Sequence, residues 1–485
     1  MTTRVLIVVL DSAEPSLVQS WAAQGYLPTI ERLSKTGGTL AIENFPGFGN
    51  GTFWPSINTG VDPSHHGCYW LAQPKPPDFS FEAFHKKDFP LPPFWKTLES
   101  EGLHVGVMDA IESPVAELER GIEIIDWITH RRDEPCRTSP PSLVDELLAR
   151  YGDDPLQGNV DSAMRQGLDL EELSAISERR IATKTEAAID LIGGGEWDLF
   201  YVVYPDPHDI GHLAWHIHES ASDRGDTADD PVRRCYQRID DALARLVSTV
   251  IPGGQTIVLM GPGMEPVTTA NHLLPDILRA FQDKPRSGAA KTLARFLRAF
   301  VRSRVLPLGV RKRLGLYKQQ MSQKAQNIAG RAYFTLPHNS KSSAVRINVK
   351  GRDPFGAVTP GRDYDELCEQ LTKRLFELRD ASGERNVVEE VIKVHDHYRG
   401  PELARLPDLM VVWNQHADLS RVSAPKLGTF SGKPTTDRTG DHSQRGLLIT
   451  DRPLETKFSQ PIDPAQVTPI LIEAAMKNRI QAGIH

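Results

Sequence analysis

The stretch Val-Leu-Ile-Val-Val-Leu-Asp at residues 5–11 decides the fold of this 485-residue chain. A short run of aliphatic residues, most of them β-branched, is typical of a strand that is buried on both faces of a parallel sheet. Asp11 ends the run, and open α/β sheets bind their ligands at the carboxyl ends of their strands. We therefore expect a buried strand that presents Asp11 at a binding edge. An aspartate that only caps the next turn fits this stretch, taken alone, equally well.

The composition is that of an ordinary globular protein, with 39% hydrophobic and 25% charged residues. No apolar run approaches the roughly 18 residues that span a bilayer, and the first residues lack the basic start and cleavage site of a signal peptide. The four cysteines are scattered without a Cys-x-x-Cys pair, which favours reduced thiols over a disulfide framework or a zinc ribbon. We therefore expect a cytoplasmic protein.

Further strand candidates, separated by long helical segments, lie at residues 104–108, 199–204 and 256–260. This alternation predicts an α/β fold with a mostly parallel sheet. A second strand-rich region has its candidates at residues 344–349, 387–394, 409–413 and 446–449. These strands either extend the same sheet or form a lobe of their own.

The charge is unevenly distributed around a net value of −7, because Lys284 to Arg331 contains thirteen Lys and Arg residues and no Asp or Glu. Within it, apolar residues at helical spacing are flanked by arginines, namely Leu293, Phe296, Leu297 and Phe300 with Arg295, Arg298 and Arg302. This pattern predicts a basic amphipathic helix. It is either the solvated face of a cap or a surface that docks on anionic lipid, and it lacks a recognisable nucleic-acid-binding motif.

Three further stretches carry candidate chemistry. The glycine-rich sequence around Asn50 and Thr52 predicts the start of a short helix that ends at Thr59-Gly60, followed by a Pro-x-x-His-Gly turn at residues 63–67. The amide N–H groups and positive dipole end of such a helix suit an anionic oxygen, although an ordinary helix cap fits this stretch alone as well.

The second stretch follows the strand at 199–204 and brings Asp206, His208, Asp209 and His212 within seven residues. Imidazole and carboxylate groups are the ligands that zinc prefers, and His208 and His212 are spaced one helical turn apart. His216 and His218 extend the run, and we expect both on the helix surface. The third stretch places His442 in a glycine-flanked loop before a strand.

In their order along residues 5–449, these motifs resemble the alkaline phosphatase superfamily, most closely its type I phosphodiesterase and nucleotide pyrophosphatase branch. The resemblance implies a three-layer α/β/α sandwich and metal-dependent hydrolysis. It implies that Asp11 binds one zinc and that a Thr or Ser at the helix start is the nucleophile. It assigns the other zinc to His212 and His442, with Asp206 or His208 as the third ligand.

The sequence departs from the family pattern at two places. Nine residues before Thr59 stands Asn50, whose amide is no nucleophile, so that Thr52 offers the nearest hydroxyl. The strand at 256–260 precedes Gly-Pro-Gly-Met instead of the Asp-His pair that completes one zinc site. The chain also has no Cys-x-Pro-x-Arg motif, which excludes the formylglycine nucleophile of the sulfatase branch.

We therefore expect an alkaline-phosphatase-like core whose N-terminal part spans residues 1–274 and whose C-terminal part spans 336–485, with a basic helical insertion or cap at 275–335. The expected function is metal-dependent hydrolysis of a phosphodiester or pyrophosphate, with zinc as the cofactor and a phosphorylated small molecule or lipid-linked compound as the substrate. The alternative is a non-catalytic member that binds a phosphorylated or anionic ligand through the same cleft. In either case an anionic membrane surface is a candidate partner of residues 284–331.

Overall fold

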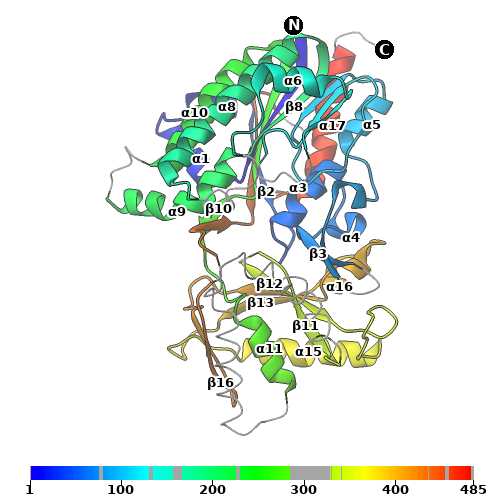
Figure 1. Cartoon of the computed structure of the whole chain (residues 1–485), viewed down its shortest axis with the longest axis vertical. Helices are drawn as coiled ribbons and strands as arrows, with labels where there is room; N and C mark the ends of the chain where they lie inside the picture. The colour runs from blue at the N-terminus through cyan, green and yellow to red at the C-terminus, as the bar shows by residue number, and fades with distance from the viewer. Residues whose placement is uncertain are drawn as a thin grey trace. The chain divides into compact units, whose positions relative to one another are not determined.

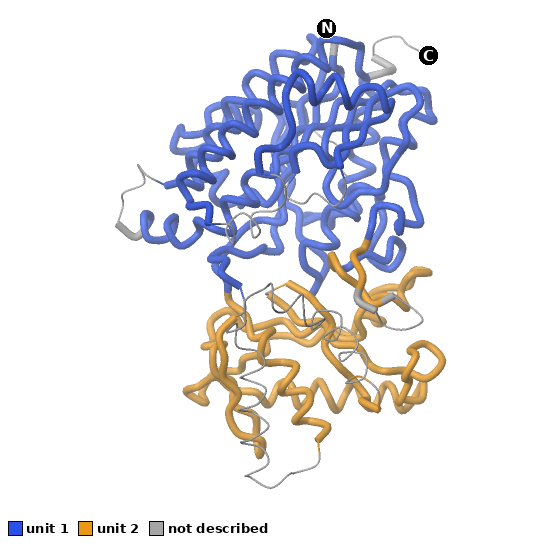
Figure 2. The backbone as a smooth tube through the Cα atoms, in the orientation of Figure 1, with its two compact units in different colours: residues 1–69, 85–267, 436–485 blue, residues 70–84, 268–435 orange. Residues whose placement is uncertain are grey.

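The computed structural model describes residues 2–75, 80–129, 135–156, 167–224, 230–283, 328, 330–339, 341–434, 436–453 and 458–481. The chain divides into two compact units, which Figure 2 shows in different colours. Unit 1 comprises residues 1–69, 85–267 and 436–485, and unit 2 comprises residues 70–84 and 268–435. The chain thus leaves unit 1 twice, for residues 70–84 and again after Val267, and returns at His85 and at Thr436. The sequence suggested divisions at 275 and 336. The basic amphipathic helix expected within 284–331 lies outside the described residues.

Unit 1 is built on an eight-stranded sheet in the order β2-β18-β9-β1-β8-β5-β6-β7. The neighbours from β9 to β6 pair in parallel, while β18 and β7 run antiparallel to their partners. The strands are β1 (Thr2–Asp11), β2 (Gly38–Glu43), β5 (Val105–Met108), β6 (Ile122–Ile125), β7 (Arg137–Ser139), β8 (Glu196–Tyr204), β9 (Val250–Gly261) and β18 (Arg445–Thr450). The mostly parallel sheet predicted from the sequence is confirmed.

The aliphatic run of β1 feeds two separate cores, because successive side chains of a strand point to opposite faces. Leu6, Val8 and Leu10 belong to the core on one face, and Val5, Ile7 and Val9 belong to the core on the other. Helices α8 (Leu170–Gly193) and α10 (Pro231–Val247) cover the first face, and α17 (Pro464–Gln481) and α5 (Phe94–Ser100) lie on the second (Figure 1). This three-layer arrangement explains why the run contains no polar residue before Asp11.

The helices of unit 1 are α1 (Pro15–Ala23), α2 (Pro28–Thr36), α3 (Asn50–Thr59), α4 (Pro63–His66), α5 (Phe94–Ser100), α6 (Leu143–Tyr151), α8 (Leu170–Gly193), α9 (Asp206–Arg224), α10 (Pro231–Val247) and α17 (Pro464–Gln481), with the 3-10 turn η1 (Lys86–Asp88). A two-stranded ribbon of β10 (Met264–Pro266) and β17 (Gly440–His442) completes the unit. Within the described residues, no helix is both long and apolar enough to cross a membrane.

Unit 2 has an antiparallel sheet of its own, in the order β11-β12-β14-β13. Its elements are α11 (Leu274–Gln282), β11 (Tyr333–Leu336), β12 (Ser342–Ile347), α15 (Arg362–Phe376), β13 (Val388–Lys393), α16 (Val394–His397), η2 (Leu403–Arg405) and β14 (Leu409–Trp413), with the hairpins β15 (Arg421–Ala424) and β16 (Gly428–Ser431), and β3 (Ala72–Lys75) and β4 (Ser80–Ala83). The C-terminal third therefore does both things that its sequence allowed: β18 joins the central sheet, and β12 to β14 form a separate one.

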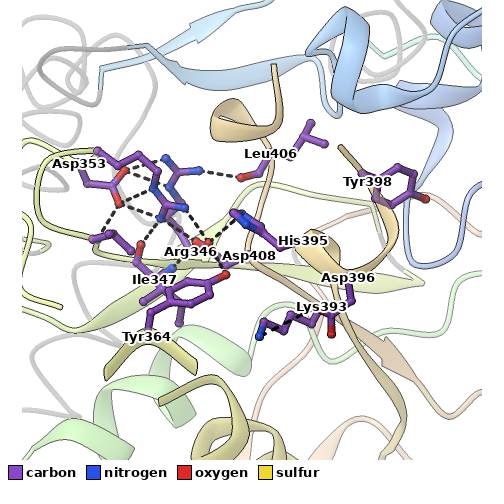
Figure 3. Close-up of polar contacts among 12 residues, drawn as sticks. Arg346, Ile347, Asp353, Tyr364, Lys393, His395, Asp396, Tyr398, Leu406 and Asp408 are labelled. Atoms are coloured by element: carbon purple, nitrogen blue, oxygen red, sulfur yellow. Dashed lines mark hydrogen bonds and ion pairs between the residues drawn. The ribbon is translucent and has the colours of Figure 1, made fainter. Parts of the chain in front are cut away.

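A network of buried charges connects β12, the residue before β14 and helix α15 of unit 2 (Figure 3). Arg352 makes two hydrogen bonds to Asp408, of 2.7 and 2.9 Å, and Arg346 donates to Asp353 at 2.7 Å. The Tyr364 hydroxyl of α15 also donates to Asp408, at 2.9 Å. Each buried carboxylate is thus paired with a guanidinium, which offsets the large cost of removing the charge from water.

Candidate metal centre

Three buried histidines converge at the carboxyl edge of the central sheet. Strand β8 ends at Tyr204 and leads directly into α9, whose first two turns carry His208 and His212, while His442 ends β17. Their ring centroids lie 4.5 to 5.1 Å apart, and their candidate ligand atoms all lie within 4.8 Å of one another. The structure thus groups His208, rather than Asp206, with the other two histidines.

Hydrogen bonds fix the orientation of all three rings. The Nδ1 atom of His212 lies 2.7 Å from the carbonyl oxygen of Gly440, and that of His208 lies 3.4 Å from the Asp209 carboxylate. His442 Nδ1 lies 3.2 Å from the Ser12 hydroxyl, which in turn donates to Asp11. In each pair Nδ1 is the donor, so the Nε2 atoms carry the lone pairs. Metal-binding histidines are oriented by such contacts in most metalloproteins, and three imidazole ligands suit a catalytic zinc.

His212 also contacts a cation of the protein itself. Its Nε2 atom lies 2.8 Å from Nη1 of Arg438, in the segment that precedes β17. Burial, the charge of Arg438 and the two neighbouring histidines lower the pKa of His212 well below its usual value. His212 is therefore a neutral imidazole, the form that binds metals.

Asp206 points away from this centre. On a helix, residues four apart share a face, whereas Asp206 is six residues before His212 and is turned by about 120° from it. Its Oδ1 atom lies 3.6 Å from Arg180 of α8, and neither carboxylate oxygen accepts a hydrogen bond from the described residues. Burial raises the pKa of Asp206 to about 6, although Arg180 acts in the opposite direction.

A buried, acid-rich network surrounds Arg180 and Lys184 of α8, next to the histidine cluster. Arg180 donates to Asp209 at 2.7 Å and lies 3.2 Å from Asp154. One turn further, Lys184 lies 2.8 Å from Asp109 and is fully buried. Counting Asp206, four carboxylates face two cations among the described residues of this network. Asp209 belongs to this network and contacts the ring of His208, so the excess negative charge lies next to that histidine.

Asp11 sits close to the centre but is tied to other groups. Its Oδ1 atom accepts hydrogen bonds from the indole of Trp54 at 2.9 Å and from Ser12 at 3.2 Å. Ser12 adopts a left-handed backbone conformation with φ of 59°, which turns the chain sharply after β1 and directs its hydroxyl toward His442. Asp11 therefore reaches the histidine cluster through Ser12.

The helix start expected near Asn50 is where α3 begins, after Gly49. Asn50 is half-buried, and its side-chain oxygen accepts no hydrogen bond from the described residues. Thr52 is fully buried, and its hydroxyl lies 3.0 Å from the carbonyl oxygen of Gly49 and 3.2 Å from Asn44. The Thr52 hydroxyl thus donates within the first turn of α3 and to Asn44 in this structure.

Where the family pattern has an Asp-His pair, Glu14 fills the space beside Gly263. The buried Glu14 carboxylate accepts hydrogen bonds from the Met264 amide at 3.1 Å and the Ser443 hydroxyl at 3.2 Å, and it pairs with Arg445 at 3.0 Å. A β-carbon built on Gly263 would overlap this carboxylate. No side chain longer than hydrogen fits at residue 263 while Glu14 occupies this position.

Two histidines of α9, His216 and His218, were expected at the helix surface. His216 is exposed, as predicted. The prediction for His218 was wrong: it is buried, because its ring lies 2.7 Å from the Asp230 carboxylate and packs edge-on against Trp21. Sequence reasoning also missed Ser12, Glu14, Arg180 and Arg438, whose partners are far away along the chain.

Unit 1 is thus a mostly parallel α/β/α sandwich with a histidine cluster at the carboxyl edge of its sheet. A model of the type I phosphodiesterase/nucleotide pyrophosphatase family matches residues 5–443, and the chain therefore belongs to this family. No curated protein sequence matches.

Two solved structures, both of one enzyme, agree with this fold. The phosphonoacetate hydrolase of Sinorhizobium meliloti 1021, in complex with phosphonoacetate, is similar with a TM-score of 0.57 and 15% identity, over 97% of this chain and 96% of that chain. The complex of the same enzyme with phosphonoformate is similar with a TM-score of 0.56 and 15% sequence identity. For human ectonucleotide pyrophosphatase/phosphodiesterase 5 the TM-score is 0.48 and the sequence identity 13%, over 98% of this chain and 95% of that chain. At such identities the similarity to the hydrolase concerns the fold alone.

Proposed function

We propose that this chain hydrolyses a phosphodiester or pyrophosphate bond with the help of one divalent cation, zinc in the first place, held by His208, His212 and His442. The observation that carries the proposal is the convergence of three buried imidazoles whose Nδ1 atoms are all engaged elsewhere. Bound there, the metal would act as a Lewis acid on a phosphoryl oxygen.

The acid-rich network supports a cation at this place. The imidazoles are neutral ligands, so they supply no charge to balance a divalent ion. The excess of carboxylates around Arg180 and Lys184 provides negative charge one layer behind, and Asp209 transmits it to His208 by direct contact. Second-layer carboxylates of this kind strengthen histidine ligands.

The test is metal content together with hydrolysis of an aryl phosphodiester. We expect about one tightly bound divalent metal per chain, and its loss with activity in His212→Ala and in His442→Ala, because two remaining ligands hold zinc poorly. His216→Ala, an exposed histidine on the same helix, is the matched control. Two equivalents of retained zinc, or equal behaviour of all three variants, would refute the three-histidine assignment.

Thr52 and Asn50 are the proposed residues on the phosphoryl side of the centre. If the Thr52 hydroxyl turns from Gly49 to attack phosphorus, Thr52→Ala lowers turnover by several orders of magnitude while metal content stays the same. If Asn50 orients the phosphoryl group for direct attack by water, Asn50→Ala has the larger effect. The ratio of the two losses in turnover decides between these roles.

A non-catalytic anion-binding member is the second candidate, and Glu14 is the observation that favours it. Its carboxylate fills the space beside Gly263, where the resemblance implied an Asp-His pair, and Asp11 is engaged by Trp54 and Ser12. This candidate predicts that a nonhydrolysable phosphodiester binds to the purified protein while no phosphodiester or pyrophosphate is turned over at any metal concentration.

For partners, we propose a phosphorylated small molecule or a lipid-linked substrate, with residues 284–331 docking on anionic membranes at the cytoplasmic surface. Thirteen basic residues without an acid carry this proposal. Co-sedimentation with anionic vesicles should fall as salt rises and should vanish when Arg295, Arg298 and Arg302 are replaced by Glu. Equal, negligible pelleting of both proteins would leave a solvated cap.

A further inference from the structure

The hydrogen bond between Arg438 and His212 occupies the atom that the metal needs. His212 directs Nδ1 to the Gly440 carbonyl, so its single remaining lone pair is on Nε2. Arg438 Nη1 lies 2.8 Å from that atom, and a guanidinium is always a protonated donor. One lone pair serves either a hydrogen bond or a metal. The two states of His212 are therefore mutually exclusive.

We propose that Arg438 is a built-in competitor of the metal: it holds His212 in a metal-free state, and a cation enters only as the guanidinium leaves. This inference rests on the proposed function, because it concerns the same three histidines. It adds a regulatory step, namely the exchange of one cation for another on the Nε2 atom of His212.

The spacing of the histidines agrees with this exchange. A tetrahedral zinc with bonds of about 2.0 to 2.1 Å brings its nitrogen ligands to roughly 3.3 Å from one another. The candidate ligand atoms of His208, His212 and His442 all lie within 4.8 Å of one another, so one ion could draw on all three. A metal held there would need the Nε2 atom of His212 that Arg438 contacts.

The positive charge of Arg438 also opposes the binding of a metal. The guanidinium beside His212 repels a second cation, and the low dielectric of a buried site makes this repulsion stronger than in water. A charge-assisted hydrogen bond has to break in addition. Removing the guanidinium should therefore raise zinc affinity by about ten- to a hundredfold, the range that corresponds to one hydrogen bond to a charged group.

The experiment measures zinc binding to the full chain by competition with a chromophoric chelator. The variants are Arg438→Gln, which keeps a polar side chain without the charge, and His212→Ala. Arg405→Ala is the matched control, because this arginine in unit 2 forms only a half-exposed pair with Glu402 among its described ion pairs. We expect at least tenfold tighter zinc binding in Arg438→Gln, unchanged binding in Arg405→Ala, and loss in His212→Ala.

A second readout follows the arginine itself. Phenylglyoxal modifies accessible guanidinium groups, and mass spectrometry quantifies the product at Arg438. Zinc should accelerate the labelling of Arg438 relative to that of Arg405 in the same sample. Equal labelling with and without zinc would overturn the exchange.

The outcomes separate this inference from the proposed function. If the wild-type protein and Arg438→Gln bind zinc equally tightly while His212→Ala does not bind it, the metal centre stands and Arg438 is no competitor. If neither the wild-type protein nor Arg438→Gln binds zinc, both the centre and the inference fail. If only Arg438→Gln bound zinc, the arginine would block the site permanently, and the proposed exchange would be overturned.

Discussion

Two buried charge networks, one in each unit, use the same residue types to different ends. In unit 2, Arg346 and Arg352 face Asp353 and Asp408, and Asp408 accepts two bonds from Arg352, one from Tyr364 and one from the Ile347 amide. Burial alone would raise its pKa, yet these bonds and the arginine charges hold the pKa of Asp408 below its usual value.

In unit 1 the balance is different. Four carboxylates share Arg180 and Lys184, and the oxygens of Asp206 accept no hydrogen bond from the described residues. Burial raises the pKa of Asp154 and that of Asp206, the latter to about 6. Removing one partner from a balanced buried network is strongly destabilising, whereas surplus buried acid is tolerated at a cost and suits a place that receives a cation.

The largest expected effect breaks the balanced network. Asp408→Asn leaves Arg346 and Arg352 to share the single carboxylate of Asp353, and we expect unfolding of unit 2 to become easier by about 3 to 5 kcal/mol. Urea unfolding followed by circular dichroism measures the loss. Asp365→Asn, an aspartate that is 54% exposed and pairs with Lys393, is the control and should cost less than about 1 kcal/mol. A similar, small cost for both variants would contradict the structural role of this network.

The same substitution in unit 1 should act with the opposite sign. Because the folded pKa of Asp206 is above its unfolded value, the folded state binds the extra proton, and its stability falls as pH rises from about 4 to 6. Asp206→Asn should therefore stabilise the chelator-treated protein by up to about 3 kcal/mol at pH 7 and by almost nothing at pH 4. Thermal unfolding at the two pH values measures this. Destabilisation at pH 7 would mean that the carboxylate is fully compensated.

The smallest effect concerns an exposed ion pair beside the acid-rich network. Arg245 of α10 lies 2.8 Å from Glu186 of α8, and both side chains are about half exposed, at 49% and 53%. Arg245→Ala should change the free energy of unfolding by less than about 1 kcal/mol, and added salt should remove the difference. A larger, salt-independent loss would show that α8 and α10 depend on this pair.

Residues that act through local patterns were predictable from the sequence. The aliphatic run of β1 specified a strand buried on both faces, and the i, i+4 spacing of His208 and His212 placed both on one side of α9. The choice between Asp206 and His208 stayed open, because it depends on where α9 begins. The structure starts the helix at Asp206, which turns this carboxylate toward Arg180.

Residues that act through distant partners were beyond a single sequence. Arg438 meets His212 across 226 positions, and Glu14 meets Met264 across 250. Neither residue lies in a motif that marks its role. His218 was expected at the surface for the same reason, since its partner Asp230 lies on the element after α9. Only the folded chain brings such pairs together.

The overlap between Glu14 and Gly263 also constrains how this lineage can change. A ligand at residue 263, introduced by a single substitution, collides with Glu14, so the order of mutations matters. If Glu14 becomes smaller first, the Met264 amide and the Ser443 hydroxyl lose their acceptor. A side chain at residue 263 and the present position of the Glu14 carboxylate are therefore alternatives, so the effect of a substitution at either position depends on the residue at the other, 249 positions away along the chain.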